Sequence, residues 1–89
     1  MTLDASDSPL EFPCELDVKA MGLNTPEFER LVEQIVQPHV TDQSLRVTKV
    51  ESRAGKYVSV RIHFTASSRA QLESIYTDLR ASERVLFAL

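Results

Sequence analysis

A change of hydrophobic period along the chain is the feature that most limits its possible folds. Over residues 57–65 polar and apolar side chains alternate without a break, with Val58, Val60, Ile62 and Phe64 on one side. This period of two is typical of a strand that buries one face. Residues 14–21 alternate in the same way. The chain therefore contains two strands that each need a cover on one face only.

Two further segments have the period of an amphipathic helix. Over residues 28–36, apolar side chains recur at i, i+3, i+4, i+7 and i+8, which places all of them on one stripe. Pro38 then discourages continuation of this helix. The same spacing returns over residues 72–79, and we expect that helix to end near Ala81.

Residues that favour the start of a helix precede both segments. For the first helix, either Thr25 is the cap with Pro26 at the first helical position, or Asn24 and Glu27 form a variant of the capping box. For the second, Ser68 begins a capping box. Each of these patterns predicts a helix.

The remaining segments predict two more strands. Residues 45–50 are rich in β-formers, but the alternation slips by one between Val47 and Val50, which predicts a bulge or an irregular edge strand. A hairpin loop follows, with Gly55 expected at a positive φ. Residues 85–89 predict a short last strand.

The resulting order, βαββαβ, predicts a ferredoxin-like α+β sandwich with a four-stranded antiparallel sheet and two helices on one face. The handedness of strand–helix–strand units puts the first and third strands in the centre, giving the order 4-1-3-2. We expect residues 1–9 to form a disordered acidic tail and residues 10–89 to form a single domain. A chain of 89 residues has room for one core.

Composition excludes several classes of function. Thirteen acidic and ten basic residues give a net charge of −3, which argues against a nucleic-acid clamp or a binder of anionic membranes. A single cysteine, Cys14, makes neither an internal disulfide nor a cysteine-based metal site. The two histidines lack a metal-binding spacing, so we expect no metal and no cofactor. The longest apolar run, residues 85–89, is too short to span a bilayer, and we expect a cytoplasmic protein.

The polar face of the predicted sheet has no cover in a monomer. One interpretation of this face is a partner or dimer surface at Lys19, Tyr57, Ser59, Arg61 and His63. The alternative is a solvated face on which Asp17 and Lys19 form cross-strand pairs with Arg61 and His63. Binding of RNA bases would need exposed aromatic side chains on both central strands, and the first strand offers none.

A second candidate site is the turn Gly22, Leu23, Asn24 and Thr25. It leads into a helix N-terminus, which favours a carboxylate or phosphate; a simple tight turn is the alternative. We find no triad or dyad and expect no catalytic residues and no enzyme. The rival interpretations are a small enzyme that uses His63 with Arg61 or Tyr57, and an interaction module that docks by its edge strand.

Several short stretches also carry a family resemblance. They are Leu10, Glu11, Phe12 and Pro13; Lys19, Met21 and Gly22; Ser52, Gly55, Tyr57, Ser59 and Val60; and Leu72, Tyr76 and Leu79. On these residues the chain resembles the YbeD family of small bacterial proteins of uncharacterised function, over residues 10–89. It departs from that pattern in its longer acidic N-terminus and in Ala20, where a larger apolar residue is expected.

The resemblance implies a domain similar to the ACT regulatory domains, which bind amino acids or other small effectors and adjust a partner enzyme. It places effector contacts at residues 22–25, at a subunit interface, and implies a link to the regulation of lipoate metabolism. The expected function is therefore a regulatory or adaptor domain. Its expected partners are a protein or a second copy of the chain, together with a small effector.

Overall fold

The computed structural model describes residues 11–40 and 45–89, which form four strands and two helices. The elements are β1 (Cys14–Leu23), α1 (Phe28–Val36), the 3₁₀ turn η1 (Gln37–His39), β2 (Arg46–Glu51), β3 (Tyr57–Ala66), α2 (Arg69–Ala81) and β4 (Phe87–Ala88). This is the predicted βαββαβ order. The predicted tail over residues 1–9, and Leu10 at the start of the predicted domain, lie outside the described residues.

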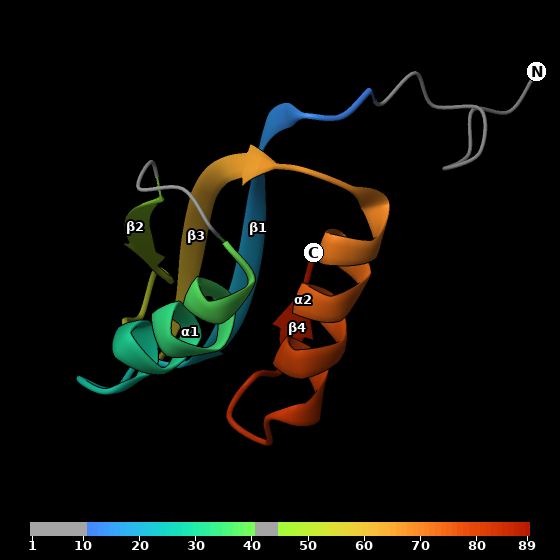
Figure 1. Cartoon of the computed structure of the whole chain (residues 1–89). Coiled ribbons are helices and arrows are strands. Elements are labelled where there is room, and N and C mark those ends of the chain that lie inside the picture. The colour runs from blue at the N-terminus through green and yellow to red at the C-terminus, as the bar shows by residue number, and fades with distance from the viewer. Residues whose placement is uncertain (1–10, 41–44) are drawn as a thin grey trace, which may run out of the picture.

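The strands form one antiparallel sheet in the order β2-β3-β1-β4. Both helices lie on the same side of this sheet (Figure 1). The predicted order 4-1-3-2 is this order read from the other edge. The ferredoxin-like fold class is therefore confirmed.

The two central strands determine which side chains face the helices. β1 and β3 pair over their whole length, from Cys14 opposite Ala66 to Leu23 opposite Tyr57. Side chains alternate between the two faces of a strand, so the predicted inward set of each strand faces the helices. The buried core consists of Val18, Ala20, Phe28, Val32, Val36, Val58, Val60, Ile62, Phe64, Ala66, Ile75, Leu79 and Ala88.

The predicted irregularity in β2 is wrong. β2 pairs with β3 without a break from Arg46 opposite His63 to Glu51 opposite Val58. Val50 instead faces away from the helices, opposite Ser59. The alternation slips because β2 is an edge strand, where Lys49 and Glu51 on the helix side remain exposed.

The predicted caps of α1 are also wrong. Its N-cap is Glu27, which makes no side-chain capping bond. The Asn24 amide Nδ2 donates to the Gly55 carbonyl oxygen at 3.0 Å, and Thr25 Oγ1 accepts from Arg84 Nη2 at 2.8 Å. Both side chains are thus used in contacts with distant loops, which local sequence does not reveal.

The cap of α2 and the hairpin glycine agree with the predictions. Ser68 Oγ accepts from the Gln71 backbone N–H at 3.1 Å. The Gln71 side chain in turn accepts from the backbone N–H of Ser67 at 2.7 Å, one residue before the N–H of Ser68 that a capping box would use. Gly55 has a φ of 75°, where a side chain is disfavoured.

Neither helix within residues 11–40 and 45–89 has both the length and the apolar character needed to cross a membrane.

Candidate functional site: the open face of the sheet

We call the side of the sheet that is turned away from the helices the open face. The strand register arranges its side chains in rows that cross the strands. One row is Val50, Ser59, Met21 and Phe87. The next row is Thr48, Arg61 and Lys19, and the backbone of Leu89 is hydrogen-bonded to the backbone of Lys19. The third row is Arg46, His63 and Asp17. The face therefore has an apolar end around Met21 and Phe87 and a charged end around Asp17 and His63.

At the charged end the side chains satisfy one another. The His63 ring lies 2.6 Å from Asp17 through Nδ1 and 3.0 Å from Glu15 through Nε2. Arg61 Nε lies 3.7 Å from the second carboxylate oxygen of Asp17. This partly agrees with the predicted cross-strand pairs, because Asp17 is opposite His63, but Lys19 is opposite Arg61, a residue of like charge.

These contacts favour the charged form of the histidine. An imidazole ring donates hydrogen bonds from both nitrogens only when it is protonated. The hydrogen bond to Glu15, and then the one to Asp17, raise the pKa of His63 above its ordinary value of 6.5. The two carboxylates of the charged end thus already have partners on the sheet.

The apolar end has no such internal partners. Among the described residues, six large apolar side chains are exposed, and five of them lie on the open face. Phe87 is 65% exposed and Leu89 is 72% exposed. The five are Met21, Leu23, Val50, Phe87 and Leu89, and the sixth is Leu86.

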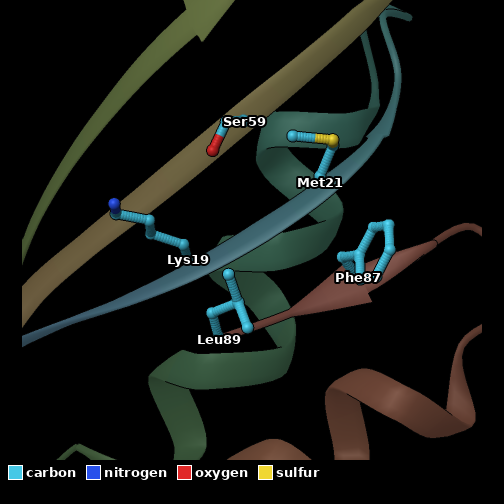
Figure 2. A pocket seen from close by; sticks show the side chains of 5 residues that line it. All are labelled: Lys19, Met21, Ser59, Phe87 and Leu89. Carbon is cyan, nitrogen blue, oxygen red and sulfur yellow. The ribbon is translucent and has the colours of Figure 1, made fainter.

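A concavity of about 410 Å³ opens at this end of the face. Met21, Phe87 and Leu89 supply its apolar lining, with Lys19 and Ser59 beside them. Figure 2 shows these side chains projecting from three neighbouring strands, with the helices behind the sheet. A smaller hollow of about 150 Å³ lies on the other side of Met21 and Ser59 and reaches Val50 and Tyr57.

The two polar groups of the concavity are unpaired. Within residues 11–40 and 45–89, the Lys19 ammonium has no ion pair and the Ser59 hydroxyl has no hydrogen bond. Both groups are therefore available to a ligand.

The structure divides the five residues that were predicted to form a partner surface. Lys19 and Ser59 line the concavity, and Tyr57 lines the smaller hollow. Arg61 and His63 belong to the charged end instead. Whether any of them contacts a partner stays a prediction.

Sequence reasoning missed the residues that make this end apolar. Met21 gave a signal, because it follows Lys19 in the outward phase of β1. Phe87 and Leu89 gave none, because their place depends on the register of β4 against β1. Val50 was missed because the slip in alternation between Val47 and Val50 predicts a bulge, which β2 does not contain.

The four residues of the predicted effector turn have different surroundings. Gly22 faces the helices, and a Cβ there would lie 2.5 Å from both the Phe28 ring and the Arg84 carbonyl oxygen. Leu23 is exposed on the open face. The side chains of Asn24 and Thr25 are bonded to the β2–β3 hairpin and to the α2–β4 connection. Effector binding at this turn stays a prediction.

Neither histidine lines the concavity. His63 belongs to the charged end, and His39 Nε2 lies 2.6 Å from Asp78, which links η1 to α2. The two rings are thus each paired with carboxylates in separate parts of the fold.

Comparison with known proteins identifies the family. The family model described as "Protein of unknown function (DUF493)" matches residues 7–89. The chain belongs to this family. A UPF0250 protein of Hahella chejuensis is 32% identical over 91 residues, which cover 100% of both chains. A UPF0250 protein of Pseudomonas aeruginosa is 37% identical over 90 residues, which cover 99% of this chain and 97% of the relative. The predicted membership in the YbeD family is confirmed.

A solved structure supports the fold of this DUF493 domain. The solution structure of protein HP0495 from H. pylori matches 100% of the chain and 94% of its own length, with a TM-score of 0.73. The sequences are 16% identical, so this likeness concerns the fold alone.

Proposed function

We propose that this DUF493 domain is a non-catalytic regulatory or adaptor domain that binds a protein partner through the apolar end of its open face. One observation carries this proposal: of the six large apolar side chains that are exposed among the described residues, five lie on one face of the sheet. Apolar side chains gathered in this way, rather than scattered singly, are typical of interaction sites. Phe87, on the edge strand β4 beside Met21, is the kind of aromatic side chain that contributes most to binding energy.

The charges of the open face indicate the chemistry of the partner. The carboxylates of Glu15 and Asp17 are held by His63 and Arg61. Lys19, by contrast, borders the apolar end and forms no ion pair with any residue that the structure describes. A partner that presents an apolar surface with a carboxylate at its edge is complementary to this arrangement.

The surroundings of His63 support a non-catalytic role. A general acid or base must reach its substrate, in a concave site that excludes water. Both ring nitrogens of His63 are instead directed at carboxylates, and the residue does not line the concavity. This arrangement favours the binding proposal over an enzyme that uses His63, because His63 lines neither of the two hollows described above.

Three finer expectations stay predictions. They are the ACT-like mode of regulation through residues 22–25, the link to lipoate metabolism, and the cytoplasmic location. Thermal-shift measurements with amino acids, nucleotides, lipoate and octanoate test the first two. A ligand at 100 times its dissociation constant adds about 2.7 kcal/mol to the free energy of unfolding.

The binding proposal is tested with two neighbouring substitutions. Phe87→Asp places a charge within the apolar end, beside Met21, whereas Leu86→Asp makes the same change in charge at an exposed residue outside it. Immobilised wild type and both variants are incubated with a native lysate, and the captured proteins are quantified by mass spectrometry. We expect a partner that wild type and Leu86→Asp retain and that Phe87→Asp loses by about 30-fold, as for an aromatic contact.

Light scattering of the same proteins separates a different protein from a second copy of the chain as the occupant. Equal capture by wild type and Phe87→Asp would contradict the proposal. A catalytic turnover that is lost in His63→Gln but kept in Phe87→Asp would favour the enzyme instead.

A further inference from the structure

The concavity beside Lys19 combines an apolar lining with two unpaired polar groups. From this combination we infer that it binds a small molecule with an apolar body and a single carboxylate. The inference rests on the proposed function in one respect, because both require the apolar end to be a binding surface. It goes further by placing a small ligand, and a class of ligand, at a defined position on that surface.

The apolar part of the ligand follows from the walls. Met21 of β1, Phe87 of β4 and Leu89, which follows β4, line the hollow with a thioether, a ring and an aliphatic side chain. Its volume of about 410 Å³ lies within the usual range of small-molecule sites. Burial of such walls is favourable only for a ligand that presents apolar surface to them.

The carboxylate follows from the polar groups. Lys19 provides a cation on a flexible stem, and Ser59 on the neighbouring strand β3 provides a neutral donor (Figure 2). Neither group has a partner within the described part of the chain. A charged donor beside a hydroxyl is suited to one carboxylate, with which hydrogen bonds are about twice as strong as between neutral groups.

Other head groups fit this site less well. A cationic ligand would be repelled by Lys19. A dianionic phosphate group is best held by an arginine fork, and Arg61 in the next row is already directed at Asp17. A ligand without charge would leave the ammonium of Lys19 without a counterpart.

Straight-chain alkanoates of four to ten carbons are suitable probes. We expect saturable binding to the full ¹⁵N-labelled chain, measured by NMR, with amide shifts that centre on Lys19, Met21, Ser59, Phe87 and Leu89. Affinity should rise about fourfold for each added methylene until the concavity is filled. The neutral amide of the same length should bind about tenfold more weakly, because it lacks the charge-assisted contact.

Two lysine substitutions separate the site from general electrostatic attraction. Lys19→Met should weaken binding of the alkanoate about tenfold and leave binding of the amide unchanged. Lys49→Met removes an exposed lysine that faces the helix side of β2 and should change neither affinity by more than about twofold. The two variants have the same net charge as each other, and their folding is checked by the dispersion of the NMR spectrum.

Three results would overturn the inference. They are equal affinity for the acid and its amide, equal losses in the two lysine variants, and shifts that centre on residues 22–25 rather than on the concavity. The partner proposal has a separate readout. If alkanoates fail to bind while capture still depends on Phe87, only the small-molecule site is wrong; if capture is also independent of Phe87, both proposals are wrong.

Discussion

The two faces of β1 differ in whether their side chains are buried in the core or remain accessible to a ligand or partner. On the inner face, Val18, Ala20 and Gly22 are buried, and Gly22 lies so close to Phe28 that no methyl group fits. On the open face, Lys19 and Met21 border a concavity, and Lys19 has no ion pair within residues 11–40 and 45–89. A strand of ten residues thus uses one side to build the core and keeps the other available. Stability and binding should therefore depend on different residues of the same sheet.

The largest expected effect compares two phenylalanines on opposite faces. Phe64 on β3 is fully buried, whereas Phe87 on β4 is 65% exposed. Phe64→Ala should lower the free energy of unfolding by about 4 kcal/mol, because it leaves a cavity in the core. Phe87→Ala should lower it by less than about 1 kcal/mol. Urea denaturation of both variants measures the difference, and similar losses would show that the open face also contributes to the core.

The next effect compares the two glycines. Gly22→Ala would place a Cβ 2.5 Å from the Arg84 carbonyl oxygen and the Phe28 ring. We expect a loss of about 3 kcal/mol, because a backbone atom and a buried ring must both move. Gly55→Ala is the matched control: its Cβ meets only the Glu51 carboxylate at 3.9 Å, an ordinary contact, but the φ of 75° costs about 1 kcal/mol. If Gly55→Ala is the more harmful of the two, the close approach at Gly22 is not what restricts this position.

The smallest expected effect concerns the charged end and its dependence on pH. The pKa of His63 is raised by its hydrogen bonds to Glu15 and Asp17, so folding favours the protonated ring. The resulting stabilisation is fully present below the ordinary pKa of 6.5 and is lost as the pH rises through the raised value. Stability should thus be greater at pH 6 than at pH 9 by a margin that His63→Gln removes.

The same cluster predicts a direct spectroscopic change. Asp17→Asn should lower the pKa of His63, measured by NMR titration of the ring protons, because the ring loses a charged acceptor. Thr48→Asn, on the open face of β2 and opposite Arg61 rather than His63, is the control. An unchanged pKa in Asp17→Asn would mean that Asp17 does not hold the ring.

The sequence was sufficient for the fold wherever the signal was local. The alternation over β3 and the apolar stripe of α1 each predict which face of the element is buried, and the buried residues of both elements lie on the predicted faces. The caps of α1 failed because Asn24 and Thr25 bond to Gly55 and Arg84, which are distant in the chain. Long-range contacts outweigh a local preference worth about 1 kcal/mol.

The candidate site was predicted only in part. Lys19 and Ser59 could be assigned to the open face from their phase alone, since side chains alternate along a strand. The concavity itself depends on how β4 aligns with β1, because Phe87 pairs with Met21 and Leu89 bonds to Lys19. A two-residue strand carries too little pattern to reveal its register.

The attachment of β4 links ligand occupancy to local unfolding. The two residues of β4 pair with Ala20 and Met21 of β1, and backbone hydrogen bonds beside them run from Leu86 N–H to the Met21 carbonyl and in both directions between Lys19 and Leu89. Phe87 and Leu89 leave the concavity whenever this short edge opens, so the binding surface exists only in the closed state. Occupancy must then slow the exchange of the Lys19 and Leu89 amide hydrogens with solvent, and any opening of the edge releases what is bound.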